Sequence, residues 1–143
     1  MTDGWRICRA PFADLSGEGA RLFGGRWNRP GLPMVYMAET AALAVLEVRV
    51  HLDLPPELMP DDYVLMQIDL NGLPMEECGS FPKDCQDIGD AWLRAQHTPI
   101  LKVPSVIVPE NANLLLNPRH PDATKARILS TRAFSLDRRL WPR

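Results

Sequence analysis

The segment from Ala41 to Val50 constrains the fold of this chain more than any other, because almost every position in it is apolar. Thr40 stands before it as a favourable helix N-cap, and two prolines follow at positions 55 and 56. The pattern predicts a helix from about Thr40 to Leu52. A helix that is apolar on nearly all sides should be covered on most of them rather than lie on the surface.

Glu47 is the exception within this helix. It shares a helix face with Leu43, Val50 and Leu54, with the spacing of a stripe that faces a core. A carboxylate in that position loses hydration unless a cation, hydrogen-bond donors or a ligand replace the lost water. Glu47 is therefore the first candidate for a functional residue.

The segment before the helix is predicted to be a loop followed by a strand. The loop, from Gly17 to Pro33, is rich in glycine and arginine, and such backbone can approach an anionic ligand closely. The strand covers Met34 to Ala38. Arg26 and Arg49 leave a second interpretation of Glu47 open, a structural ion pair, because buried pairs also occur without function.

The length and composition predict a single domain, residues 1–143, with a sizeable core. Hydrophobic residues make up 45% of the chain and charged residues 24%, and the net charge of −2 lacks the basic excess of a protein that binds nucleic acid directly. No apolar run approaches the roughly 20 residues that span a bilayer, and the first residues show no signal-peptide pattern. We expect a cytoplasmic protein.

The cysteines and histidines form no recognisable site. Cys8, Cys78 and Cys85 include no C-x-x-C pair, and the three histidines are scattered along the chain. This pattern argues against a disulfide framework and against a bound metal. No motif supports a Cys–His nucleophile pair.

The remaining elements are predicted from alternation and β-rich composition. The polar region from Pro74 to Asp90 is expected to be mostly loop, and the basic C-terminal tail a solvated terminus. Further strands are predicted at Trp5–Arg9, Tyr63–Leu70 and 126–129, a buried leucine run at 114–116, and a second helix at Ile88–Gln96. Pro99–Val103 and Ser105–Val108, separated by Pro104, are predicted to be two strands or one strand with a bend.

Five segments carry a family resemblance: GEGARLFGGRWN, VYMAET, ALAVLEVRVHL, VPSVIVPE and NLLLNPRHPD. In this order they resemble the RES-domain proteins, the toxin half of bacterial RES–Xre toxin–antitoxin pairs, from Trp5 to about Ile128. The resemblance implies an α+β domain with an ADP-ribosyltransferase-like split antiparallel sheet around a cleft that holds NAD. It also implies that NAD is consumed as a substrate and that a small helix-turn-helix antitoxin of the Xre type is the partner, so that DNA is contacted only through the antitoxin.

The resemblance assigns site residues as well. The arginine, glutamate and serine that name the family fall on Arg26 of GGRWN, Glu47 of VLEV and Ser105 of VPSVIVPE. It also points to Tyr36 and Arg6 as cleft residues. The implied catalytic residues are Arg26, Tyr36 and Glu47, and the residues implied to bind NAD are Arg6, Arg26, Tyr36 and Ser105. The role of the Asn117–Asp122 loop stays open.

These residue types suit cleavage of the bond between nicotinamide and ribose. The reaction generates an oxocarbenium-like cation, which Glu47 can stabilise while it orients the ribose. Tyr36 offers a ring for stacking on nicotinamide, although it can equally be a core tyrosine of its strand. Arg26 and Arg6 can each give paired hydrogen bonds to a pyrophosphate, although a lone arginine such as Arg6 is more often solvated. Ser105 can donate its hydroxyl to phosphate or ribose.

Three functions follow from this reading. The first is an NAD-degrading toxin that acts by hydrolysis or phosphorolysis. The second is a mono-ADP-ribosyltransferase, which breaks the same bond but passes ADP-ribose to a protein. The third is a non-enzymatic binding module in which Glu47 and Arg26 only form a buried ion pair. The glycine-rich loop lacks both the P-loop and the Rossmann signatures, so neither class is supported.

Overall fold

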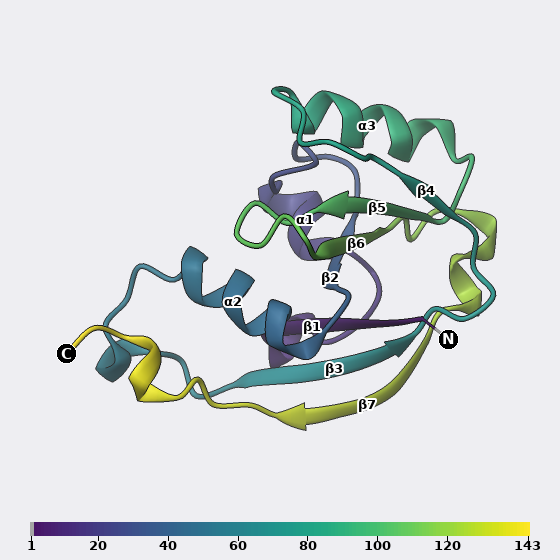
Figure 1. The fold of residues 1–143 in the computed structure, drawn as a ribbon. Coiled ribbons are helices and arrows are strands. Elements are labelled where there is room, and N and C mark those ends of the chain that lie inside the picture. The colour runs from purple at the N-terminus through teal and green to yellow at the C-terminus, as the bar shows by residue number, and fades with distance from the viewer. Residues whose placement is uncertain (1) are drawn as a thin grey trace.

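Seven strands form one sheet in the computed structural model, which describes residues 2–143 (Figure 1). Their order along the sheet is β4-β5-β6-β2-β1-β3-β7, and all neighbours are antiparallel except β4 and β5. The strands are β1 (Asp3–Arg9), β2 (Val35–Ala38), β3 (Tyr63–Asp69), β4 (Met75–Glu77), β5 (Ile100–Pro104), β6 (Ala112–Leu116) and β7 (Arg127–Ala133). The helices are α1 (Glu18–Phe23), α2 (Ala41–His51) and α3 (Cys85–Ala95), with 3-10 turns η1 (Ala10–Phe12), η2 (Pro56–Leu58), η3 (Pro121–Lys125) and η4 (Arg138–Leu140).

The sheet opens in its middle, between β1 and β2. These two strands share a single register pair, Trp5 with Ala38, whereas β1 pairs with β3 along its whole length. One half therefore consists of β1, β3 and β7, and the other of β2, β6, β5 and β4, and the two halves diverge in Figure 1. The predicted split antiparallel sheet is confirmed.

The two halves are held together by apolar clusters on both faces of the sheet. The leucine run of β6 shows why both faces are covered: Leu114 and Leu116 join a cluster with Met66 of β3, while Leu115 points the other way into a cluster with Trp92 of α3. A continuous apolar run is what a strand buried on both faces requires. The predicted core run of β6 is confirmed.

The helix α2 lies across the split and packs on β1 and β2. Thr40 caps it as predicted, because its hydroxyl accepts a hydrogen bond of 3.1 Å from the backbone N–H of Leu43. The expected coverage was wrong, since Leu46 is 38% exposed and Val50 is 60% exposed. The sheet covers only one side of α2, and an apolar pattern on nearly all sides does not tell which side that is.

Three further predictions from sequence were wrong in part. The glycine-rich loop contains the helix α1, and the region from Pro74 to Asp90 contains β4 and the first turns of α3. Residues Ser105–Val108 form a turn instead of a strand, because the Ser105 hydroxyl accepts hydrogen bonds from the backbone N–H groups of Ile107 and Val108 at 3.1 and 3.2 Å.

The C-terminal tail packs against the end of α2 instead of being solvated. Trp141 is buried, and its indole N–H donates to the carbonyl of Leu54 at 2.8 Å. The guanidinium of Arg49 lies 4.5 Å from the Trp141 ring centroid and donates to the carbonyl of Leu140 at 3.0 Å. The last residues therefore hold the helix that carries Glu47. Within residues 2–143, no helix has the length and apolar character needed to cross a membrane.

Candidate active site

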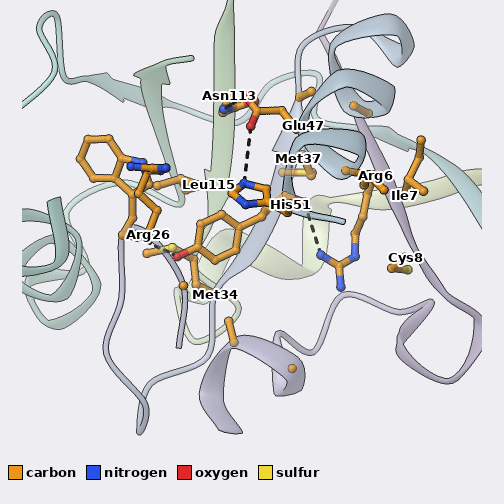
Figure 2. Close-up of a pocket in the computed structure, with 18 of the residues that line it drawn as sticks. Arg6, Ile7, Cys8, Arg26, Met34, Met37, Glu47, His51, Asn113 and Leu115 are labelled. Atoms are coloured by element: carbon orange, nitrogen blue, oxygen red, sulfur yellow. Dashed lines mark hydrogen bonds and ion pairs between the residues drawn. The ribbon is translucent and has the colours of Figure 1, made fainter. Parts of the chain in front are cut away.

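A cleft of about 660 Å³ lies where the two halves of the sheet separate. This volume falls within the range of small-molecule sites, about 300–1,000 Å³. Its walls come from β1, β2, α1 and α2, and four of the five predicted site residues line it, namely Arg6, Arg26, Tyr36 and Glu47. Figure 2 shows Arg6 and Arg26 on opposite sides of the cleft, with Glu47 and His51 of α2 between them.

Glu47 is held by uncharged donors. Its Oε1 accepts hydrogen bonds of 2.8 Å from the hydroxyl of Ser105 and of 2.8 Å from the side-chain amide of Asn113. Its Oε2 lies 4.0 Å from Nε2 of His51, and the side chain is 23% exposed. One carboxylate oxygen is therefore fixed by Ser105 and Asn113, while the other is approached by His51 and has no hydrogen bond among the described residues.

The ion-pair interpretation of Glu47 does not hold. Among residues 2–143, no salt bridge joins Glu47 to Arg26 or to Arg49. Arg49 faces the C-terminal tail, and Arg26 lies 5.7 Å from the ring centroid of Phe81. The carboxylate is thus not bound by a guanidinium, which leaves it available to a cationic centre.

Ser105 lies behind Glu47 rather than on the cleft wall. Its side chain is 1% exposed, and its hydroxyl proton is used in the bond to Glu47. The same oxygen closes the turn after β5 by accepting two backbone N–H groups. The geometry gives Ser105 a means to orient the carboxylate, while a direct contact of Ser105 with NAD stays a prediction.

Tyr36 of β2 presents its ring to the cleft and fixes its hydroxyl in the loop before β2. The hydroxyl donates to Oδ1 of Asn28 at 2.6 Å and accepts from the backbone N–H of Trp27 at 3.0 Å. Burial raises the pKa of this phenol, so it remains protonated. A Cβ on Gly25 would lie 2.5 Å from the same oxygen, so the ring position requires a glycine there.

Arg6 of β1 points into the cleft, so it is not an ordinary solvated arginine. Its Nη1 donates to the carbonyl of Tyr36 at 3.4 Å, which bridges the split between the two halves of the sheet. Its Nε is buried and has no hydrogen-bond partner among the described residues. An unsatisfied buried donor is costly and rare, which marks Arg6 as a residue whose position the fold alone does not explain. Burial raises the pKa of the Cys8 thiol nearby, although Arg6 acts in the opposite direction.

Arg26 is exposed and borders two cavities. A second cavity of about 570 Å³ lies between the Arg26 loop and the start of α3, and Arg26 and His51 line both. Gln86 of α3 anchors this loop, since its side-chain amide donates to the carbonyls of Gly25 at 3.1 Å and Asn28 at 3.3 Å. The guanidinium therefore projects from a fixed backbone and carries no ion pair among residues 2–143.

The Asn117–Asp122 loop lies outside the cleft. Asn117 is buried and donates to the carbonyl of Leu93 at 3.0 Å, while its own oxygen accepts from the backbone N–H of Arg119. His120 accepts from the backbone N–H of Asp122 through Nδ1. These contacts shape the turn between β6 and η3 and connect it to α3, which is a structural role.

Sequence reasoning missed two residues that organise the site, Asn28 and Asn113. Asn28 is fully buried and joins Tyr36 to the backbone of α1 and of its own loop. Asn113 lies on the same face of β6 as Leu115. An asparagine in line with core leucines of a strand could have indicated this residue from the sequence. A polar side chain at such a position needs a partner, and for Asn113 that partner is Glu47.

Comparison with known proteins identifies the family. The RES domain matches residues 4–137. The chain is 41% identical over 142 residues to the "Prs ADP-ribosylating toxin" of Sphingobium sp. (strain YBL2), covering 89% of this chain and 86% of the relative. It is 39% identical over 145 residues to "Toxin Res" of Pseudomonas putida KT2440, covering 96% of this chain and 98% of the relative.

A third relative is known both by sequence and by structure. A stretch of 35 residues, 24% of this chain and 19% of the relative, is 60% identical to the "NAD(+) phosphorylase MbcT" of Mycobacterium tuberculosis. The crystal structure of the M. tuberculosis MbcT–MbcA toxin–antitoxin complex matches 94% of this chain and 84% of the solved chain with a TM-score of 0.76, at 22% identity, which shows a common fold. The family match and the two long relatives together show that this chain is a member of the RES-domain family.

Proposed function

We propose that this chain is the toxin of a toxin–antitoxin pair and that it cleaves the nicotinamide–ribose bond of NAD within one domain, residues 1–143. The observation that carries the proposal is the position of Glu47. Its side chain lines the cleft, and its Oε1 atom is fixed by Ser105 and Asn113. Arg6 supports it with a buried unpaired Nε in the same cleft. The names of the relatives, an NAD(+) phosphorylase and an ADP-ribosylating toxin, agree with this chemistry.

In the proposed reaction the carbon–nitrogen bond breaks and nicotinamide leaves with the electron pair. Nicotinamide is neutral once released, so its departure needs no general acid. Positive charge develops on the ribose, and a carboxylate whose position is already fixed stabilises that charge without reorganising. The Oε2 atom of Glu47 is the oxygen available for this role, and the amide of Asn113 and the hydroxyl of Ser105 hold it in place.

The other cleft residues would bind the dinucleotide. The ring of Tyr36 is held from its hydroxyl end and offers its face to nicotinamide. Arg6 and Arg26 supply guanidinium groups that pair with phosphate oxygens. Because the two arginines stand on opposite sides of the cleft, we assign the pyrophosphate first to Arg6, which lies at the split of the sheet beside Tyr36. Arg26 then lies at the boundary of the two cavities, both of which it lines.

A second candidate differs only in the acceptor of ADP-ribose. The chain shares 41% identity with a relative named as an ADP-ribosylating toxin, which favours transfer to a protein. The relative named as an NAD(+) phosphorylase favours phosphate instead, and water is the third acceptor. All three reactions use the same bond cleavage at Glu47. A binding module without enzymatic activity predicts that NAD is not turned over at all.

Product analysis tests the proposal directly. Purified protein is incubated with NAD in buffers with and without phosphate, and the products are identified by mass spectrometry. Free ADP-ribose indicates hydrolysis, its phosphorylated form indicates phosphorolysis, and a mass increase on protein indicates ADP-ribosylation. We expect nicotinamide release from the purified protein, and intact NAD after prolonged incubation with phosphate would refute both hydrolysis and phosphorolysis.

The proposed partner is a separately encoded antitoxin with a helix-turn-helix domain. The solved relative is a toxin–antitoxin complex, and the chain shares its fold over most of its length. A cleft that opens to solvent on one side of the sheet can be closed by a single inserted segment. Steric exclusion of NAD would then be sufficient for inhibition.

A further inference from the structure

Two phenylalanines at the cleft belong to none of the apolar clusters of the core. Phe23, the last residue of α1, is 76% exposed, and Phe12 of η1 is 36% exposed, yet both line the cleft. Neither ring is therefore buried in the core of the described chain. Exposed aromatic rings that line a ligand cleft are suited to stack on a planar group of the ligand.

The position of Phe23 is fixed by hydrogen bonds around the end of α1. The carbonyl of Ala20 accepts from the backbone N–H of Gly24 at 2.8 Å and from the side-chain amide of Asn28 at 2.9 Å. The carbonyl of Arg21 accepts from the N–H of Gly31 at 2.8 Å. Gly24 ends the helix with φ of +73°, a conformation that favours glycine. The ring therefore extends from an anchored helix end rather than from a free loop.

The same network connects Phe23 with the reaction centre. Asn28 donates to Ala20 at the end of α1 and accepts from the hydroxyl of Tyr36, so α1 and the nicotinamide-facing tyrosine share one anchor. In Figure 2 the purple ribbon of α1 lies on the lower side of the cleft, and Glu47 on α2 lies on the upper side. A dinucleotide with its nicotinamide ribose at Glu47 would pass Arg6 and reach the wall formed by α1.

We propose that Phe23, bordered by Phe12, is the platform that binds the adenine ring of NAD. The inference rests on the proposed NAD cleavage and extends it to the part of the substrate that does not react. Phe12 packs beside α1, where its ring would lie 3.6 Å from a Cβ at Gly19, and thus closes one side of the platform. Stacking on a phenylalanine recognises the base without hydrogen bonds, so it supplies affinity for a dinucleotide over a mononucleotide.

The test compares two substrates that share the scissile bond. NAD carries adenine, whereas nicotinamide mononucleotide has the same nicotinamide–ribose bond and no adenine. Phe23→Ala should lower kcat/KM for NAD by about tenfold, in the range of a lost base–aromatic stack. It should change kcat/KM for nicotinamide mononucleotide by less than about twofold, because this substrate has no adenine to stack on Phe23. Phe23→Trp should keep or raise the preference for NAD.

Leu22→Ala is the matched control. Leu22 is the neighbouring residue of α1 and is 52% exposed, but it does not line the cleft. This variant should leave both substrates unaffected. Equal losses on the two substrates in Phe23→Ala, or an unchanged preference for NAD, would overturn the adenine platform. Failure of the wild-type protein to cleave NAD would instead overturn the proposed function, so the two failures are distinguishable.

Discussion

At the scale of single residues, Glu47 differs from a structural carboxylate in the nature of its partners. Both hydrogen bonds reach the same oxygen and both come from uncharged groups, Ser105 and Asn113. A carboxylate that only stabilised the fold would be expected to pair with a cation, since a buried charge otherwise loses its hydration without compensation. The arrangement fixes one carboxylate oxygen and leaves the other, which His51 approaches to 4.0 Å, for substrate.

Glu47→Gln tests this role. Glutamine keeps the shape and can still accept from Ser105 and Asn113 through its carbonyl oxygen, but it has no charge to stabilise a cation. We expect kcat for NAD cleavage to fall by about 100-fold or more, the scale of losing an electrostatic stabiliser of a transition state. The unfolding temperature should change little, which circular dichroism can check. Glu77→Gln on β4, at an exposed site away from the cleft, is the control.

A wild-type rate in a folded Glu47→Gln protein would contradict the assignment. A variant that fails to fold would show instead that the carboxylate is needed for structure. Circular dichroism separates these two results, because it reports on folding independently of turnover.

At the scale of elements, the sequence predicted those parts whose patterns are local. The strand before α2 and the helix itself follow from an N-cap, an apolar run and terminating prolines, and both are present. The helix α1 was missed because it is six residues long and glycines flank it, and because distant groups such as the Asn28 side chain satisfy its last carbonyls. Ser105–Val108 has strand composition, but one hydroxyl captures two backbone N–H groups and makes a turn.

The sequence indicated which residues would form the candidate site, but it did not indicate how they would be arranged. Arg6, Arg26, Tyr36 and Glu47 were brought together as expected. Sequence alone did not reveal that Asn113 of β6 completes the carboxylate site, because that contact joins residues 66 positions apart in the chain. Tertiary contacts of this kind depend on strand order, which a local pattern does not contain.

The close approach of Gly25 to Tyr36 gives a prediction about the Arg26 loop. In Gly25→Ala the new Cβ would come to 2.5 Å from the tyrosine hydroxyl, so the ring or the loop has to move. We expect a loss of about 1–3 kcal/mol in the free energy of unfolding, as for other overpacked sites, together with a lower kcat/KM for NAD. Denaturant unfolding and steady-state kinetics measure the two effects.

Gly79→Ala is the matched control for that variant. A Cβ at position 79 would meet nothing within 4 Å, so both the stability and the activity should stay close to those of the wild type. An equally neutral Gly25→Ala would contradict the prediction. It would show that the Arg26 loop can move despite its hydrogen bonds to Gln86 and Tyr36.

At the scale of the whole molecule, the cleft arises because the sheet splits between β1 and β2. The two halves touch at one register pair, and α2 spans the gap with its carboxylate pointing into the opening. The C-terminal tail holds the far end of α2 through Arg49 and Trp141, so residues distant in the chain contribute to the position of Glu47. The cleft is thus a property of the topology rather than of one loop.

This architecture predicts the behaviour of the protein in a cell. NAD is shared by many reactions, so expression of the wild-type chain alone should lower cellular NAD and arrest growth. Expression of Glu47→Gln should do neither, because the same fold would lack the charge that cleavage requires. Co-expression of the neighbouring antitoxin should restore both NAD and growth by covering the cleft. Cellular NAD is measured by an enzymatic cycling assay beside growth curves, and growth arrest with undiminished NAD would contradict NAD depletion as the cause of toxicity.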